Sequence, residues 1–328
     1  MAKANHRMAS RFFDVAVVLL VLVSAASTQA YGSLTPDYYA SICPQALPTI
    51  KRLVSAAVKK ERRMGASLLR LHFHDCFVNG CDASVLLDES HPNSERNARA
   101  NLRSARGFEV IDQIKKEVDR TCGRSVVSCA DILTVAARDS VTALGGPWWE
   151  VPLGRRDSKQ AFLERANSDL PEPGMDLPAL INSFAKQGLD DKDLVVLSGG
   201  HTLGFSQCRA FRDRIYGDSN IDTWFANSLK KVCPQVAGNG DANLSGLDST
   251  PARFDVNYFT NLLYKKGLLH SDQALFGGVS TDQLVKSYAY NPKLFWDDFA
   301  YSMIKMGNIK PLTGYQGQIR VKCSKVNY

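Results

Sequence analysis

The sequence predicts a mainly α-helical globular protein. Apolar residues recur at three- and four-residue spacing over several segments, whereas strand-like alternation is rare and short. The 328 residues are 45% hydrophobic and 22% charged, which provides enough apolar surface for a buried core and excludes a disordered or collagen-like chain. We therefore expect one large or two moderate helical domains.

The helical segments follow one another with clear stops between them. The first, residues 47–63, carries its apolar side chains on one face with charges between them. Glycine and proline at residues 145–147 end the fourth segment, and Gly188 ends the fifth. The remaining predicted helices are residues 65–77, 108–120, 129–144, 178–187 and 292–306.

The amino-terminal segment has the layout of a cleaved secretion signal. Three basic residues precede an apolar run at residues 15–26, and small residues follow it. This run is shorter than the ~20 residues that a membrane-spanning helix needs. We expect a signal peptide at residues 1–30 and a mature domain at residues 31–328, although a cut nearer Ala26 also fits the pattern.

Charge and cysteine content restrict the class of protein further. The formal net charge of +7 suits weak attraction to acidic surfaces, but no dense Lys/Arg cluster or known nucleic-acid motif accompanies it. The eight cysteines are even in number and scattered, which is typical of an oxidised extracellular protein whose disulfides staple an existing core. Spacing alone does not choose among their many possible pairings.

The densest chemical segment lies in the predicted helix at residues 65–77. Arg70, Phe73 and His74 stand at i, i+3 and i+4, so a cation, an aromatic ring and a neutral base share one helix face. His72 is expected to point elsewhere. The structural alternatives are a hydrogen-bonded core histidine and a surface arginine.

An oxygen-rich loop follows this helix directly. Carboxylates, carbonyls and a hydroxyl at near-alternate positions suit a hard cation, and Ca²⁺ fits this donor set better than Zn²⁺. Cys76 and Cys81 could close a small loop around the ion, and an ordinary acidic turn is the alternative. The candidate ligands are Asp75, the carbonyls of Val78 and Gly80, Asp82 and Ser84.

A second histidine, His201, follows an apolar run and lies between glycines. Such glycines permit close approach, so the segment could admit a flat cofactor. A structural histidine is an equally weighted alternative, because histidine burial is intermediate in proteins.

Over essentially the whole mature chain, the sequence resembles the class III haem peroxidases, which are the secretory peroxidases of plants. The resemblance implies a mainly α-helical, two-lobed fold with four disulfides and with haem b held non-covalently between distal and proximal halves. The matching motifs are RLHFHDC at 70–76 for the distal helix, LSGGHT at 197–202 for the proximal segment, and the framework runs at 106–108, 127–131 and 151–157.

The family pattern assigns a role to each distal residue. His74 resembles the base that takes a proton from H₂O₂ and returns it to the leaving oxygen, and Arg70 would stabilise the developing charge. Asn101 matches the position that orients His74, and Phe73 would wall the pocket.

On the proximal side, the resemblance implies that His201 is the axial iron ligand. Asp272 would accept its other ring proton, which makes the imidazole more electron-rich. From its own surroundings in the sequence, Asp272 would pass for a surface turn residue.

Two Ca²⁺ sites follow from the same resemblance. Glu95 would join the distal site through water and link it to the network of His74. The proximal site departs from the family pattern in its spacing. A single residue, Ser249, separates Asp248 from Thr250, where we expect at least two intervening residues. Ser249 could partly substitute. The implied proximal ligands are Thr202, Asp248, Thr250, the carbonyl of Arg253 and Asp255.

The cysteines agree with the family, in which each has a defined partner. The implied pairs are Cys43 with Cys122, Cys76 with Cys81, Cys129 with Cys323, and Cys208 with Cys233.

The expected function is therefore a secreted haem peroxidase that reduces H₂O₂ and oxidises small phenolic donors by one-electron steps. Pro171 and Pro173 match the family's Pro-x-Pro at the haem edge, where donors approach; a stiff loop is the alternative. The family roles are lignification, wall cross-linking and the response to oxidative stress. We expect a monomer in the cell wall or apoplast rather than the vacuole, with weak attraction to acidic wall polysaccharide and no nucleic-acid or membrane partner after signal cleavage.

Two other functions are compatible with parts of the sequence. A metallohydrolase could use His72, His74 and Asp75, but residues at i and i+2 of a helix face apart, unlike the i, i+4 pair of a helical zinc site. A secreted haem-binding protein that interacts with the wall and has little turnover would keep the fold. The complete set of expected catalytic residues disfavours it.

Overall fold

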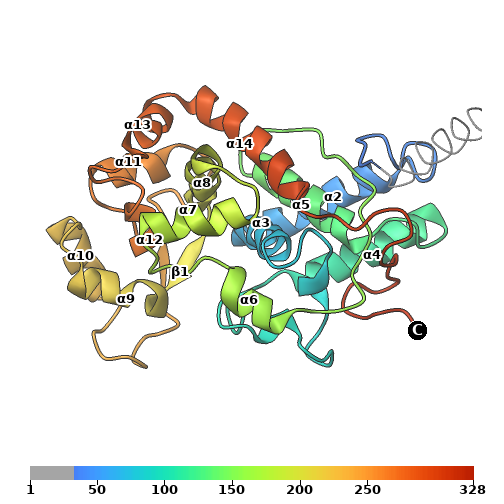
Figure 1. The fold of residues 1–328 in the computed structure, drawn as a ribbon, viewed down its shortest axis with the longest axis horizontal. Coiled ribbons are helices and arrows are strands. Elements are labelled where there is room, and N and C mark those ends of the chain that lie inside the picture. Colours follow the sequence, from blue (N-terminus) through green and yellow to red (C-terminus); the bar gives the residue numbers. More distant parts are fainter. Residues whose placement is uncertain (1–32) are drawn as a thin grey trace, which may run out of the picture.

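The computed structural model describes residues 33–328, in which helices dominate (Figure 1). The predicted signal peptide lies outside the described residues. The elements up to the middle of the chain are α2 (Ala46–Lys60), α3 (Arg63–Cys76), η1 (Ser84–Leu86), η2 (Glu95–Asn97), α4 (Phe108–Cys122), α5 (Cys129–Ala143) and α6 (Leu163–Asp169). The later elements are α7 (Leu177–Lys186), α8 (Asp191–Ser198), η3 (Gly199–Thr202), β1 (Phe205–Gln207), α9 (Cys208–Gly217), α10 (Thr223–Lys230), β2 (Leu244–Gly246), α11 (Asn257–Leu263), α12 (His270–Gln273), α13 (Asp282–Tyr290) and α14 (Pro292–Gly307).

Helix α3 occupies the middle of the molecule. It packs against α5, and α2 packs against both α4 and α5, so these four helices form one half of the fold (Figure 1). Nearly every residue of α5 is buried, since it lies between the other helices rather than at the surface. Helices α7, α8, α11 and α12 lie on the other side of α3, so α3 lies between them and α5 (Figure 1).

The six predicted helices all form, with ends shifted by at most about one turn. The shorter helices α6 and α8 to α13 were not predicted, because a helix of two or three turns carries too little periodicity to be recognised and depends on tertiary packing for its stability. The apolar run before His201 forms one of these unpredicted helices, α8. This helix begins with a capping box: the Asp190 carboxylate accepts the Asp193 N–H, and the Asp193 carboxylate accepts the Asp190 N–H.

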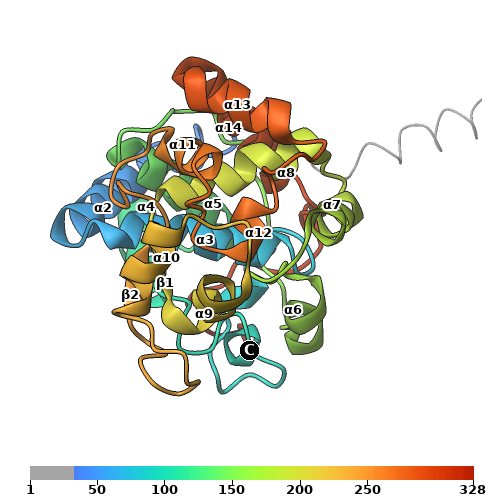
Figure 2. The same cartoon turned by 90° about the vertical axis from the view of Figure 1, so that its left-hand side faces the viewer.

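The strands are as few and short as the sequence indicates. Strands β1 and β2 pair antiparallel, with Phe205 opposite Gly246. Figure 2 shows both strands beside α9 and α10, and Figure 1 shows β1 at the end of the molecule away from α4. Between residues 33 and 328, no helix is both long and apolar enough to cross a membrane.

The four disulfides have the pairing implied by the family resemblance. Cys129 and Cys323 join α5 to the carboxyl-terminal segment, and Cys43 and Cys122 join the start of the described chain to the end of α4. The remaining bonds are Cys76 to Cys81 and Cys208 to Cys233. The expectation of a helical fold stapled by disulfides is confirmed.

Candidate active site

A cavity of about 570 Å³ lies between α3 and the segments around His201 and Asp272. Arg70, Phe73 and His74 of α3 line one side, as their shared helix face predicts. His201 and Asp272 line the other side, although they are far from α3 in the sequence. The two motifs that looked separate in the sequence therefore face a common space.

His74 is held in a single protonation form by Asn101. Asn101 Nδ2 donates to the Glu95 carbonyl at 2.9 Å, which leaves its Oδ1 as the acceptor for His74 Nδ1 at 2.5 Å. His74 Nε2 is consequently the nitrogen without a proton. Burial, followed by the charge of Arg70, holds the pKa of His74 well below its ordinary value of 6.5. The ring is thus a neutral base near neutral pH.

Arg70 is fixed by two hydrogen bonds at the cavity wall. It donates to Ser104 Oγ at 2.9 Å and to the Ala100 carbonyl at 2.8 Å. Burial, together with the nearby charges of Arg209 and Arg63, lowers its pKa to about 10. The guanidinium therefore stays protonated at neutral pH, and the alternative of a free surface arginine is excluded.

His201 and Asp272 form a hydrogen-bonded pair at the opposite wall. His201 Nδ1 donates to Asp272 Oδ1 at 2.7 Å, which leaves Nε2 as the ring nitrogen able to bind a ligand. The His201 side chain is 41% exposed, whereas that of Asp272 is 2% exposed. Asp272 is therefore a buried partner of the histidine and not the surface turn residue that its local sequence suggests.

Close packing explains a glycine beside His201. A Cβ on Gly199 would lie 2.6 Å from Phe295 and 2.7 Å from Phe259, so only glycine lets this turn approach the aromatic side chains of α11 and α14. At Gly200, which lines the cavity, an added Cβ would meet Leu69 only at 3.6 Å. The turn is therefore closely packed against the aromatic core at Gly199 and has free space toward the cavity at Gly200.

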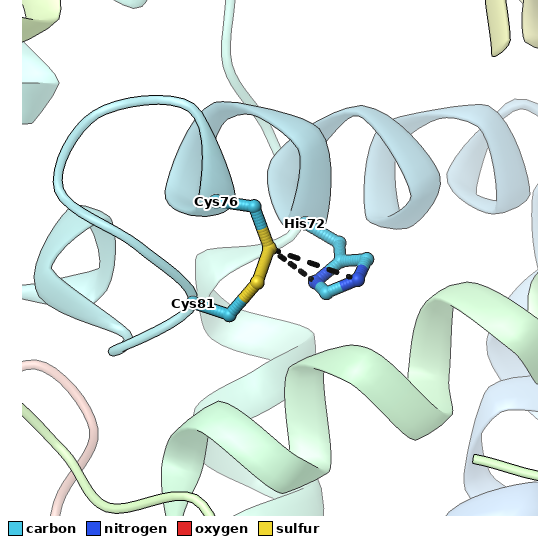
Figure 3. A group of neighbouring side chains, drawn as sticks. All are labelled: His72, Cys76 and Cys81. Carbon is cyan, nitrogen blue, oxygen red and sulfur yellow. Dashed lines mark hydrogen bonds between the residues drawn. A yellow bond between two sulfur atoms is a disulfide. The ribbon is translucent and has the colours of Figure 1, made fainter. Parts of the chain in front are cut away.

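His72 points away from this cavity. It packs against the disulfide between Cys76 and Cys81, with its Nδ1 3.5 Å from Cys76 Sγ (Figure 3). Sulfur atoms joined in a disulfide are not thiolates and cannot serve as thiolate metal ligands. Burial and the charge of Arg155 also lower the pKa of His72 to about 3. His72 is therefore a structural residue, and the metallohydrolase hypothesis loses one of its ligands.

The loop after α3 gathers buried oxygen atoms around a small volume. Asp75, Asp82 and Glu95 are each at most 1% exposed, and burial raises the pKa of all three carboxyl groups, that of Glu95 to about 8. Asp75 Oδ1, Ser84 Oγ and Glu95 Oε2 have no hydrogen-bond partner within the described part of the chain. Three crowded acids and unpartnered oxygens are the arrangement that a bound cation would satisfy.

Backbone geometry shapes the same loop. Gly80 has a φ of +117°, and a Cβ there would lie 2.5 Å from the Lys310 carbonyl, so a side chain does not fit. The Val78 N–H donates to the Asp75 carbonyl at 3.3 Å. Val78 and Gly80 thus lie in the turn between the predicted acidic ligands, where their carbonyls were expected to contribute.

A second group of oxygens forms next to His201. Thr202 Oγ1 lies 2.9 Å from Asp248 Oδ2, 3.3 Å from Asp255 Oδ1 and 3.5 Å from the Arg253 carbonyl. Thr250 Oγ1 lies 3.0 Å from Asp255 Oδ2 despite the shortened spacing. Burial is the main cause that raises the pKa of Asp248, to about 6. The predicted proximal ligands therefore converge, and the exposed Ser249 is not part of the hydrogen-bonded group.

The segment that contains the two prolines contributes to the wall of the cavity. Pro171 and Pro173 both line it, and the Pro173 carbonyl accepts the Ser271 N–H at 2.9 Å, next to Asp272. Glu172, which lies between the two prolines, pairs with Arg99 at 3.1 Å, and both residues also line the cavity. The Pro-x-Pro segment is thus tied to the structure that carries the proximal carboxylate.

Some residues at the site were not predicted. Arg63 and Arg209 line the cavity and add positive charge to it. Tyr258 of α11 is not among the lining residues, but its hydroxyl donates to Asp272, which is one of them. Arg63 could have been found, because it lies seven residues before Arg70 on the same helix face. Neither Arg209 nor Tyr258 has such a signal, since their positions depend on contacts between distant segments.

Comparison with known proteins agrees with this geometry. The family model described as peroxidase matches residues 50–291. The chain is 57% identical to Peroxidase 70 of Zea mays, with 98% of this chain and 100% of that relative covered. It is 53% identical to Peroxidase 4 of Vitis vinifera, with the same coverage, and 54% identical to Peroxidase RIP1 of Medicago truncatula, with 96% and 98% covered. The chain therefore belongs to the peroxidase family, as a class III plant peroxidase.

Proposed function

We propose that this peroxidase carries haem b and two Ca²⁺ ions and uses H₂O₂ to oxidise small phenolic donors in the cell wall or apoplast. The observation that supports it best is the opposition of two histidine systems across one cavity. His74 with Asn101 lies on one wall, and His201 with Asp272 lies on the other. A low-turnover haem-binding protein would have no need for this complete set.

The lining of the cavity fits haem. His201 offers an uncommitted ring nitrogen, since its Nδ1 proton is donated to Asp272. Phe73 and Leu69 line the cavity with apolar surface, and Arg63 and Arg209, which also line it, would provide cationic partners for the carboxylates of the porphyrin. The bound iron would supply the redox centre at which peroxide is reduced and to which the donors return electrons.

The side chains of the chain then manage protons and charge. His74 Nε2 accepts a proton from one oxygen of H₂O₂ and returns it to the oxygen that leaves as water. Arg70, held by Ser104 and Ala100, stabilises the negative charge that develops on the leaving oxygen. In the balanced reaction, two phenol molecules each lose one electron and one proton, and H₂O₂ becomes two water molecules.

Both calcium proposals rest on oxygen donors. The distal site would use Asp75, Asp82, Ser84, Glu95 through water, and the carbonyls of Val78 and Gly80. The proximal site would use Thr202, Asp248, Thr250, Asp255 and the carbonyl of Arg253. The Glu95 carbonyl accepts from Asn101, so the distal site would be linked to His74 through two hydrogen bonds. If metal analysis finds one Ca²⁺ per chain, the proximal assignment is wrong.

Secretion is supported by the four disulfides, which persist in oxidising compartments. By family analogy we assign the enzyme to lignification, wall cross-linking and the oxidative stress response. Pro171 would lie at the edge where phenolic donors approach, since it lines the cavity and matches the family's Pro-x-Pro.

The test is the visible spectrum of the purified holoprotein before and after one equivalent of H₂O₂, followed by a phenolic donor. We expect a ferric haem spectrum that changes with peroxide and returns to its original form with the donor. A haem spectrum indifferent to peroxide would support the haem-binding alternative instead. A protein that binds zinc and no haem would revive the metallohydrolase hypothesis.

Two variants separate the roles of the cavity walls. His74→Ala should retain the haem spectrum and slow the response to peroxide by ~10² to 10⁴, the usual contribution of a general acid or base. His201→Ala should change the ferric spectrum itself before any peroxide is added. If His74→Ala reacts at the rate of the unaltered enzyme, the proton-transfer role is wrong.

A further inference from the structure

Tyr258 is a buried tyrosine that contacts the proximal carboxylate. It lies on α11 and is 1% exposed. Its hydroxyl lies 3.1 Å from Asp272 Oδ1, the same oxygen that receives the His201 Nδ1 proton at 2.7 Å. Asp272 Oδ2 accepts the Leu269 N–H at 3.0 Å. One carboxylate is therefore shared by a histidine, a tyrosine and a backbone amide.

The direction of the tyrosine bond follows from the chemistry of the pair. An ionised carboxylate only accepts hydrogen bonds, so Tyr258 is the donor. Burial, reinforced by the charge of Asp272, raises the pKa of Tyr258 above its ordinary value of 10.0, and the hydroxyl keeps its proton at physiological pH. The tyrosine ring stands edge-on to the His201 ring, with centroids 6.1 Å apart. Tyr258 is thus a permanent and well-oriented donor.

We propose that Tyr258 is a positioning residue that tunes the proximal histidine through Asp272, an inference that rests on the proposed role of His201 as the haem ligand. A second donor on Oδ1 withdraws negative charge from the oxygen that attracts the His201 proton. The imidazole is consequently less electron-rich than Asp272 alone would make it. Since an electron-rich axial ligand favours the more oxidised iron, Tyr258 shifts the ferric–ferrous balance toward the ferrous form.

Tyr258→Phe tests this proposal, because it removes the donor and keeps the ring that packs at 5.1 Å against Phe259. The measurement is spectroelectrochemical titration of the holoenzyme. At a fixed potential, we expect the ratio of ferrous to ferric protein to fall about three- to tenfold, which is ~30 to 60 mV toward negative potential for a one-electron couple. Resonance Raman spectra of the ferrous form should show a higher iron–histidine stretching frequency.

Tyr288→Phe is the matched control. Tyr288 is also buried, packs against Phe259 at 5.2 Å, and donates to a different carboxylate, Asp298, at 2.9 Å. Removal of its hydroxyl should cost stability but leave the potential and the iron–histidine frequency unchanged. Equal shifts in the two variants, or no shift in Tyr258→Phe, would overturn the proposal.

A second substitution covers the case in which Tyr258→Phe does not fold. Site-specific 3-fluorotyrosine at position 258 is a stronger donor of nearly the same shape, so the potential should move in the positive direction. An unchanged or more negative potential would also overturn the proposal. Failure of the proposed function would look different, because the unaltered protein would then show no haem spectrum that responds to peroxide.

Discussion

Asn101→Ala is the most direct test of how the distal base is prepared. Asn101 is 3% exposed, accepts from His74 Nδ1 at 2.5 Å, and donates to the Glu95 carbonyl at 2.9 Å. The substitution removes the acceptor but leaves His74, Arg70 and the proximal pair in place. It should therefore affect the proton transfer and leave the binding of haem unchanged.

The size of the effect follows from the charge that His74 acquires. A hydrogen bond to a neutral group contributes about 0.5–1.5 kcal/mol, and one to a charged group about 1.5–3 kcal/mol. The bond to Asn101 therefore becomes stronger by about 1–1.5 kcal/mol as His74 takes up the peroxide proton. Since ~1.4 kcal/mol corresponds to a tenfold change in rate, its loss should slow the step about tenfold. Loss of the preferred tautomer should add roughly a factor of two.

Stopped-flow absorbance after mixing the holoenzyme with H₂O₂ measures this step. We expect the second-order rate constant of Asn101→Ala to fall about 10- to 20-fold. Asn101→Asp restores an acceptor for His74 Nδ1 and should remain within about threefold of the unaltered enzyme. If Asn101→Ala reacts within about twofold of the unaltered enzyme while its haem spectrum is the same, the hydrogen bond has no role in activating His74.

Four further outcomes are expected. Because the pKa of His74 lies well below its ordinary value, through burial and then the charge of Arg70, the peroxide rate constant should stay flat through pH 6.5 and fall only in more acidic buffer. Arg70→Leu should lower the pH-independent value of this rate constant by ~10² to 10³ and should move its fall in acid to higher pH. If the fall in acid stays at the same pH, Arg70 does not influence the pKa of His74. The hydrogen bonds from His270 to Asp176 and Asp218 raise the pKa of His270, so its stabilising effect is fully present below the unfolded-state pKa and is lost as pH rises through the folded-state pKa. In thermal unfolding, His270→Asn should therefore lower Tm more near pH 5 than near pH 9, and an equal loss at both would contradict this account. Removal of divalent cations with a chelator should lower Tm, and Ca²⁺ at 100 times its Kd should restore about 2.7 kcal/mol; a Tm indifferent to both treatments would exclude a structural calcium.

The spacing of residues along the chain was enough to predict much of the distal side of the cavity. Arg70, Phe73 and His74 share a helix face because of the helical repeat alone, and the structure lines the cavity with all three. The long helices could be predicted for the same reason, since their apolar periodicity extends over several turns. The oxygen-rich loop could also be recognised, because its candidate ligands are close in sequence.

Family resemblance extended the prediction to residues with no local signal. The pairing of the cysteines and the partnership of His201 with Asp272 came from motif matches; the structure contains the four disulfides and a hydrogen bond between these two side chains. Without that resemblance, Asp272 would have passed for an exposed turn residue. The role of each residue toward haem, peroxide and calcium stays a prediction for the experiments above.

The sequence by itself determined the helical class, the distal helix face and the oxygen-rich loop, because each depends on neighbours within a few turns of chain. Only the tertiary structure decided that His74 Nε2 is the free base nitrogen, that His72 packs on a disulfide, and that Tyr258 shares the carboxylate of Asp272. These features arise where segments far apart in the chain pack together. Burial and hydrogen bonding at such contacts set protonation, and no local pattern encodes them.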